Sequence, residues 1–143
     1  MTITLTQEQL DAIRRHGESD YPHECCGLLI GSFASDGRKV GEEVYPISNA
    51  REETAKRNRF LITPEEMLRG EKHARSAKRD IVGVYHSHPD HPAVPSQFDL
   101  DHAWPVFSYI IVAVREGRAE DLLSWELRAD RSQFDAEELR KGP

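Results

Sequence analysis

An eight-residue run from Phe107 to Val114, Phe-Ser-Tyr-Ile-Ile-Val-Ala-Val, restricts the fold of this chain more than any other feature. The run is rich in β-branched and aromatic residues, which favour a strand, and it carries no charge. Two more short, mainly apolar runs lie at Cys25–Gly31 and Ile81–His88. Continuous apolar strands of this kind are buried on both faces. The three runs therefore predict a central sheet that other elements cover.

Three helices are predicted from their start signals. Thr6 precedes the first helix as a capping residue. Thr63 caps the second, and Pro64 occupies its first position, where proline is favoured. The third is short and follows a proline-rich loop. The predicted ranges are Gln7–His16, Thr63 to about Lys78, and Ser96–Ala103.

Strands and helices alternate along the chain, and short antiparallel pairs are expected at the ends. This order predicts an α/β chain with a layered α+β arrangement, in which helices flank a mixed central β-sheet. The sequence has no internal repeat and no linker rich in Pro, Gly or Ser, so residues 1–143 are expected to form a single domain. The remaining predicted strands are Lys39–Ile47, Phe60–Ile62, Ser124–Leu127 and a short one near Gln133–Phe134.

Composition excludes several classes of protein. Hydrophobic residues make up 38% and charged residues 31%, which suits a soluble globular protein and not a disordered one. No stretch approaches the roughly 18 apolar residues of a membrane span, so no membrane association is expected. The formal charge of −6 argues against a nucleic-acid partner, which needs clustered Lys and Arg.

Location and redox state are also predicted. The first residues lack the basic and apolar segments of a secretory signal, which indicates a cytoplasmic protein. The two cysteines, Cys25 and Cys26, are adjacent, so their side chains would point to opposite faces of a strand and a bridge between them would be strained. Both are expected to be reduced thiols, as is usual in the cytoplasm.

The candidate chemistry lies where the strand Ile81–His88 ends. His86 and His88 are two residues apart, so on a strand both imidazoles lie on one face, roughly 6.6 Å apart along the backbone. Two neutral imidazoles side by side suit a borderline metal such as zinc, and a catalytic zinc site needs a third protein ligand. Asp99, in the first turn of the third predicted helix, is the natural third ligand.

These residues resemble the signature of a known family. The motif reads His86-Ser87-His88-Pro89, six residues, Ser96, two residues and Asp99. It is similar to the signature of the JAMM, or MPN-plus, zinc metalloproteases. The order of the predicted elements resembles that family over nearly the whole chain, which implies the MPN/JAMM architecture, a fold related to that of the cytidine deaminases.

The resemblance implies a role for each site residue. His86, His88 and Asp99 would hold one catalytic Zn²⁺ ion per chain, with a water in the fourth position. Glu24, which precedes the apolar strand at Cys25, matches the family's glutamate and would act as general base and then general acid. Ser96 would donate a hydrogen bond to the oxyanion.

The resemblance further implies a hydrolase, a zinc metallopeptidase of the JAMM type. Its substrate would be an amide or isopeptide bond after the Gly-Gly tail of a ubiquitin-like sulfur-carrier protein, either free or conjugated. A Gly-Gly tail suits a narrow slot and could add as a strand along a sheet edge. The region Val40–Ile47 and the polar loop Ser48–Arg59 could form that edge. A homodimer stays open.

Alternatives remain for both function and residues. The chain could be a non-catalytic MPN protein-binding scaffold, or a DNA-repair-associated protein like the RadC group. A deaminase is excluded, because its His-x-Glu and Pro-Cys-x-x-Cys motifs are absent. Cys25 is most simply a strand residue, and His91 and His102 are surface residues that could support the site. The basic residues Arg51, Lys56, Arg57 and Arg59 form a solvated loop that could also contact an acidic partner.

Overall fold

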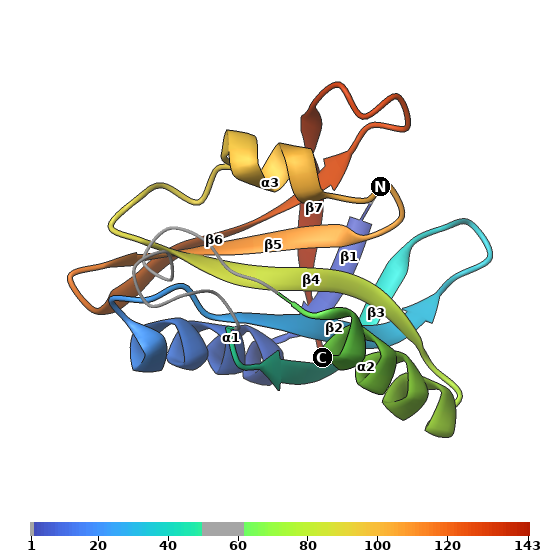
Figure 1. Ribbon diagram of the computed structural model, residues 1–143. Helices are drawn as coiled ribbons and strands as arrows, with labels where there is room; N and C mark the ends of the chain where they lie inside the picture. Colours follow the sequence, from blue (N-terminus) through green and yellow to red (C-terminus); the bar gives the residue numbers. More distant parts are fainter. Residues whose placement is uncertain (1, 50–61) are drawn as a thin grey trace.

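The computed structural model describes residues 2–49 and 62–143. Strands are the most abundant regular element of the described part, and three helices lie around them (Figure 1). The elements in chain order are β1 (Thr2–Thr6), α1 (Gln7–Asp20), β2 (Cys26–Phe33), β3 (Lys39–Ile47), α2 (Pro64–Ser76), β4 (Asp80–Pro89), α3 (Gln97–His102), β5 (Ser108–Arg115), β6 (Arg118–Leu127) and β7 (Phe134–Gly142).

The seven strands form one sheet in the order β1-β3-β2-β4-β5-β6-β7, and the sheet closes because β1 pairs with both β3 and β7. The pairs β1/β3, β1/β7 and β4/β5 are parallel, and the others are antiparallel. The predicted mixed sheet is therefore confirmed. Its closure was not predicted, because it depends on β1, whose buried residues are only Ile3 and Leu5.

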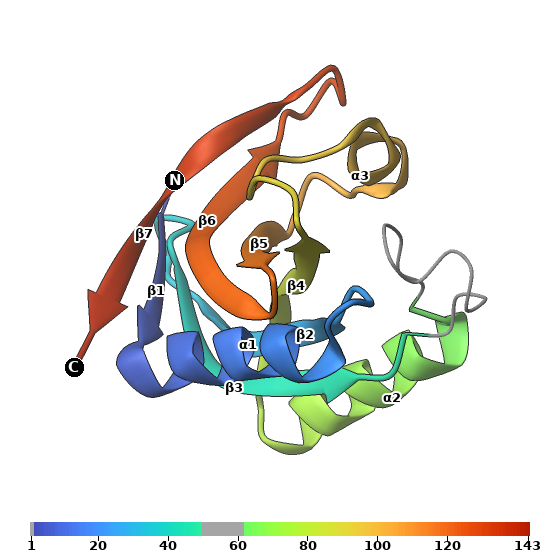
Figure 2. The ribbon, with the colours of Figure 1, turned by 90° about the vertical axis from the view of Figure 1, so that its left-hand side faces the viewer.

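Helix α1 begins where the sequence predicts and ends later. The Thr6 side chain accepts a hydrogen bond from the Gln9 N–H, and the Gln9 side chain accepts one from the Thr6 N–H, which completes a capping box. The buried face of the helix contains Leu10, Ile13 and Gly17. This face contacts the strands β1, β3, β4, β5 and β6, and Figure 2 shows the helix lying across them.

Helix α2 packs closely on β2 and β4 through small residues. Thr63 caps it and accepts a hydrogen bond from the Glu66 N–H, while Gly70 and Ala74 face the sheet. A Cβ atom at Gly70 would lie 2.3 Å from Leu28 Cδ1, so glycine permits this close approach. In Figures 1 and 2, α1 and α2 lie at the bottom of the molecule and α3 lies at the top.

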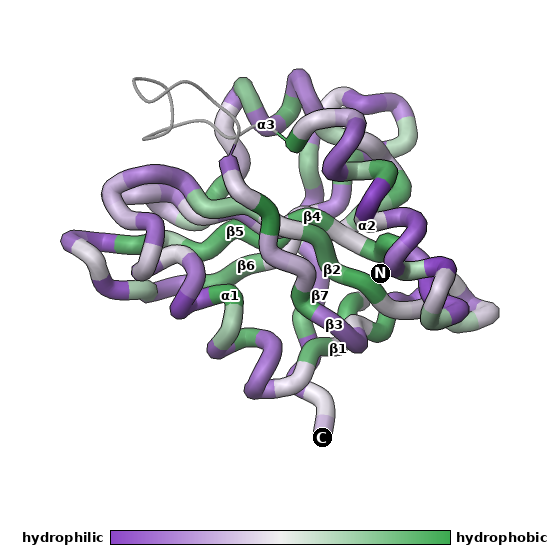
Figure 3. The backbone as a smooth tube through the Cα atoms, turned by 60° about the horizontal axis from the view of Figure 1, so that its bottom comes forward, coloured by the Kyte–Doolittle hydropathy of each residue, from purple (hydrophilic) through white to green (hydrophobic). Residues whose placement is uncertain are grey.

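The core divides into clusters on the two faces of the central strands. One cluster contains Leu10 and Ile13 of α1 together with Val82 and Tyr85 of β4. The other contains Val84 of β4, with residues of β2, β5 and β6. In Figure 3 the hydrophobic colour follows the central strands, as expected for strands that are buried on both faces. The upstream residues of β4 therefore pack tightly and fix the direction of the histidines that follow.

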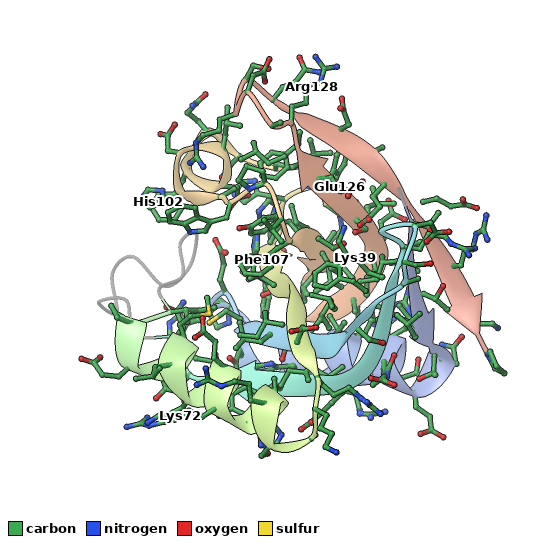
Figure 4. All side chains as sticks on the ribbon, turned by 90° about the vertical axis from the view of Figure 1, so that its right-hand side faces the viewer. Lys39, Lys72, His102, Phe107, Glu126 and Arg128 are labelled. Carbon is green, nitrogen blue, oxygen red and sulfur yellow. The ribbon has the colours of Figure 1, made fainter. Side chains whose placement is uncertain are left out.

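A buried ionic cluster joins β3 to β6 and β7. Lys39 Nζ lies 2.9 Å from Glu126 Oε2 and 3.1 Å from Glu137 Oε2, and Figure 4 shows Lys39 beside Glu126. Ser108 and Ser124 donate hydrogen bonds to Glu137 Oε1 at 2.5 and 2.7 Å. The cluster supplies a cation and hydrogen-bond donors to the fully buried Glu137 carboxylate, near the point where the sheet closes.

The predicted elements are mostly confirmed. The strand Lys39–Ile47 has the predicted bounds, and the three apolar runs lie in β2, β4 and β5, apart from Cys25 and Phe107, which directly precede β2 and β5. The strands predicted around Ser124 and Phe134 extend further, as β6 and β7. The predicted strand Phe60–Ile62 and the loop Ser48–Arg59 lie mostly outside the described residues. No helix in the described ranges is long and apolar enough to span a membrane.

Candidate active site

His86 and His88 lie on the same face of β4 and are both buried, with 1% and 6% of their surface exposed. The backbone of His86 pairs with Cys26 of β2 and Ile111 of β5, and that of His88 pairs with Ala113 of β5. Neighbouring strands therefore hold both sides of β4 at this point. The centroids of the two imidazole rings are 5.0 Å apart.

Asp99 reaches the histidines from the first turn of α3. Asp99 Oδ1 lies 3.4 Å from His86 Nε2, and Asp99 Oδ2 lies 3.2 Å from His88 Nε2. Ser96 caps the helix: its hydroxyl accepts a hydrogen bond from the Asp99 N–H, and its own N–H donates one to Asp99 Oδ2. This capping box fixes the carboxylate in the orientation in which it faces both imidazoles.

These distances fit a bound zinc ion. Zinc binds imidazole nitrogen and carboxylate oxygen at about 2.0–2.2 Å, so neighbouring atoms of a tetrahedral set lie about 3.3–3.5 Å apart. Asp99 Oδ1 lies 3.4 Å from His86 Nε2 and Asp99 Oδ2 lies 3.2 Å from His88 Nε2, so each carboxylate oxygen shows this spacing to one of the two imidazoles. The donor set of two imidazoles and one carboxylate is also one that zinc prefers.

The hydrogen bond on the far side of the His88 ring supports the same fit. His88 Nδ1 lies 2.8 Å from the carbonyl oxygen of Pro92. A carbonyl oxygen can only accept, so Nδ1 carries the proton, and in a neutral imidazole Nε2 presents its lone pair to Asp99. Two lone pairs that face each other need a cation or a proton between them. Such a backbone partner is also typical of a metal-bound histidine.

Glu24 approaches His86 from the other side of the ring. It directly precedes Cys25, at the entrance to β2, and is 3% exposed. Glu24 Oε1 lies 3.3 Å from His86 Nδ1, and Asn49 Nδ2 donates a hydrogen bond to the Glu24 carbonyl. In the described part of the chain, one potential ligand atom from each of Glu24, His86 and His88 lies within 4.8 Å of the other two. Asp99 is outside that group, although its two oxygens each contact one histidine Nε2.

The charges of the site act on one another. Burial opposes the charged form of His86, but the carboxylates of Asp99 and Glu24 outweigh this effect and raise the pKa of His86 above its ordinary value. Burial likewise opposes the charged form of Asp99. Here His86, His88 and the Ser96 N–H outweigh it, and the pKa of Asp99 is well below its usual range. The surroundings of Asp99 therefore stabilise its ionised form, which faces the two imidazoles.

An open cavity of about 670 Å³ leads to these residues. Glu24, His88 and Ser96 form part of its wall, so a molecule in the cavity could reach all three. The rest of the described lining is partly apolar and consists of His91, Pro92, Val94, Pro95, Gln97 and Phe98.

The structure thus brings together all five residues singled out in the sequence: Glu24, His86, His88, Ser96 and Asp99. Of the histidines left open, His91 lines the cavity, and the His102 ring stacks on Phe98, with the ring centroids 4.0 Å apart. Cys25 and Cys26 are free thiols and fully buried.

Two groups next to the site were not found from the sequence. One is the Pro92 carbonyl, which orients His88; a backbone oxygen has no signature in the amino-acid order. The other is the Ser87 hydroxyl, which accepts a hydrogen bond from the Cys25 N–H beside Glu24. A signal for Ser87 was available, because a polar residue at a buried position of a strand needs a partner.

Comparison with known proteins gives consistent matches over most of the chain. A desampylase of Haloferax volcanii is 37% identical over 114 residues, which cover 76% of this chain and 78% of the relative. A CysO-cysteine peptidase of Mycobacterium tuberculosis is 29% identical over 126 residues, 87% of this chain and 82% of the relative. The solution structure of a protein from Desulfitobacterium hafniense covers 98% of this chain and 92% of its own, with a TM-score of 0.84 and 32% identity.

A family model also matches the sequence. The model of prokaryotic homologs of the JAB domain matches residues 6–128, from the cap of α1 to the end of β6. This range contains all five candidate site residues. The family expected from the His-Ser-His-Pro motif is therefore confirmed, and the chain belongs to the prokaryotic homologs of the JAB domain, within the JAB/MPN family.

Proposed function

We propose that this chain is a zinc-dependent metallopeptidase of the JAMM type, which hydrolyses an amide or isopeptide bond after the Gly-Gly tail of a ubiquitin-like sulfur-carrier protein. The observation that carries the proposal is the convergence of His86, His88 and Asp99, with contacts of 3.2 and 3.4 Å, beside an open cavity. The names of the relatives, desampylase and CysO-cysteine peptidase, support both the hydrolase class and this class of substrate.

In this proposal His86, His88 and Asp99 hold the metal. His88 binds through Nε2, because its Nδ1–H is committed to the Pro92 carbonyl. His86 presents Nε2 toward Asp99, while its Nδ1 lies against Glu24. When bound, zinc supplies Lewis acidity and lowers the pKa of water to about 7.

Glu24 transfers a proton from the attacking water to the leaving amine. Its carboxylate accepts a proton from the attacking water and later donates it to the leaving amine, so one group serves as base and then as acid. Burial beside His86 and position in the cavity wall suit this role, because the carboxylate reaches the substrate while little bulk water reaches the carboxylate.

Ser96 stabilises the oxyanion. Its Oγ already accepts the hydrogen bond from Asp99 N–H, which fixes the oxygen, and its hydroxyl hydrogen is available to donate into the cavity. An oxyanion donor of this kind typically contributes about 10²–10³ in turnover.

The substrate tail would approach along β3. Among the described residues, β1 pairs with β3 only at Lys39 and Val40, whereas β2 pairs with β3 along its length, from Phe33 to Cys26. The part of β3 beyond Gly41, whose carbonyl accepts a hydrogen bond from Gln9 Nε2, could therefore accept an added strand. Its last residue, Ile47, pairs with Cys26, so a tail that follows β3 would end beside Glu24.

The wider setting follows the same proposal. The partner is a sulfur-carrier protein or its conjugate, and the enzyme works in the cytoplasm as a single domain over residues 1–143, without nucleic acid or membrane. The cytidine-deaminase-like character of the architecture and a homodimer stay predictions. Neither a non-catalytic scaffold nor a RadC-like role is favoured by the peptidase names of the relatives.

A glutamate exchange tests the proposal. Glu24→Gln removes the proton acceptor with little change in shape, so it is expected to retain zinc and to lose at least about 10²-fold in hydrolysis of a carrier conjugate. Glu8→Gln, on the exposed surface of α1, is the matched control and should keep the wild-type rate. A Glu24→Gln variant that cleaves the conjugate at the wild-type rate would show that the base is misassigned.

A further inference from the structure

The loop between β4 and α3 is anchored to the sheet by one tryptophan of β6. Trp125 Nε1–H donates a hydrogen bond to the Ala93 carbonyl at 3.0 Å. The Trp125 side chain also packs against a small buried cluster formed by Ala93, Ile111 and Ala113. Ala93 is only 2% exposed, so the middle of this loop is docked on the sheet.

The anchored residue lies between the two halves of the candidate site. Pro92, directly before Ala93, supplies the carbonyl that accepts the hydrogen bond from His88 Nδ1–H at 2.8 Å. Three residues after Ala93, Ser96 begins the capping box that fixes Asp99. A shift of Ala93 would therefore move the partner of one candidate ligand and the helix start that carries another.

The start of the loop is fixed separately. Asp90 Oδ1 accepts a hydrogen bond from the Glu116 N–H at 2.8 Å, and Asp90 Oδ2 accepts one from the Tyr21 hydroxyl at 2.7 Å. The Asp90 N–H donates to the Val114 carbonyl. These contacts fix the chain at Asp90, where it leaves β4. Pro92 lies between Asp90 and Ala93, so the position of its carbonyl depends on both the Asp90 contacts and the Trp125–Ala93 hydrogen bond.

We propose that Trp125 is a positioning residue of the metal centre, which sets zinc affinity through the Ala93 and Pro92 carbonyls and the ring of His88. The inference rests on the proposed function. Its physical basis is that the Nδ1 partner of a ligating histidine fixes the tautomer and direction of the ring. Loss of such an outer partner typically costs about 10–100-fold in metal affinity.

The two tryptophans of the chain provide a matched experiment. Trp125→Phe keeps an aromatic ring against Ala93 and removes the N–H donor. Trp104→Phe makes the same exchange at a side chain that is 61% exposed. Zinc affinity is measured by competition with a chelator of known affinity. Trp125→Phe is expected to bind zinc about 10–100-fold more weakly than wild type, and Trp104→Phe is expected to bind it equally.

The outcomes separate this inference from the proposed function. Wild-type protein that binds no zinc contradicts both. Wild type that binds zinc, together with folded Trp125→Phe that binds it equally tightly, contradicts this inference alone. A purely structural role would lower the unfolding temperature of the metal-free protein and leave zinc affinity unchanged.

A fluorescence measurement covers the case in which Trp125→Phe does not fold. In Trp104→Phe, the selectively excited tryptophan emission reports on Trp125 alone, and it is expected to change when the chelator removes zinc, because the loop joins Trp125 to His88. An emission that does not respond to zinc in this variant, while the same sample loses its metal, would overturn the inference.

Discussion

Ser87 Oγ accepts a hydrogen bond from the Cys25 N–H at 2.8 Å, and the Ser87 N–H donates one to the Cys25 carbonyl at 3.2 Å. Ser87 lies between the two candidate zinc-binding histidines, and Cys25 directly follows Glu24. These two hydrogen bonds therefore hold the segment that carries Glu24 against β4, the strand that carries His86 and His88. Both residues are fully buried, so water cannot replace either partner.

Ser87→Ala is expected to destabilise the protein by about 1–3 kcal/mol, because it leaves the buried Cys25 N–H without its side-chain acceptor. Urea unfolding measures the loss. Ser76→Ala, at an exposed hydroxyl near the end of α2, is the control and should change stability by less than about 0.5 kcal/mol. Equal midpoints for the two variants would contradict the importance of this contact.

Ser96 is assigned two roles that a pair of capping variants separates. Ser96→Ala and Thr63→Ala each remove a helix cap, so each should cost about 0.5–2 kcal/mol in stability. Only Ser96→Ala removes the proposed oxyanion donor, so, when the variants are compared at equal zinc content because the Ser96 cap also orients Asp99, only this variant should lose about 10²–10³ in turnover. Steady-state kinetics on a carrier conjugate makes the comparison. Equal turnover for both variants would show that Ser96 caps the helix and does not act as the oxyanion donor.

Lys39 is predicted to stabilise the closed sheet. Lys39→Met leaves the fully buried Glu137 carboxylate without its cation and should cost about 3–5 kcal/mol. Arg79→Met, which removes an exposed ion pair with Glu42, should cost at most about 1 kcal/mol. Denaturant unfolding of both variants tests this difference. A Lys39→Met protein that unfolds at the wild-type midpoint would show that the cluster does not stabilise the closure.

The two thiols are predicted to be inert in the folded protein. Burial raises the pKa of Cys25 to about 12 and also raises the pKa of Cys26. At pH 8 a thiol reagent should therefore label neither residue until denaturant unfolds the chain. Because the thiols of the unfolded chain ionise near their ordinary pKa of 9.0, stability should fall as the pH rises from about 9 to about 12. Rapid labelling at pH 8 without denaturant would contradict this prediction.

The features that could be predicted from the sequence are those that local interactions determine, namely the helix starts and the spacing of the candidate ligands. Thr6, Thr63 and Ser96 mark the three helix starts, because each supplies a side-chain oxygen to a backbone N–H in the first turn. The histidine pair and Asp99 could be aligned because a strand has a fixed period and the loop between them is short. The family resemblance then added Glu24, which is remote in sequence from the other four residues.

Contacts between distant segments could not be predicted in this way. With only five residues, β1 is too short to show a reliable strand pattern in the sequence. The closure of the sheet depends on the pairing of β1 with β7, at the other end of the chain. The Pro92 carbonyl and the Trp125 anchor are similar cases. Both arise from where the fold places a backbone oxygen, and that position is a property of packing.

The most direct test of the central claim is the zinc content of purified protein after reconstitution, measured for wild type and for His88→Ala. His73→Ala, whose imidazole pairs with Glu43 on the outside of the sheet, is the control. Wild type and His73→Ala are predicted to hold close to one zinc ion per chain, and His88→Ala is predicted to hold far less. Wild-type protein without zinc, or His88→Ala with as much zinc as wild type, would contradict the account.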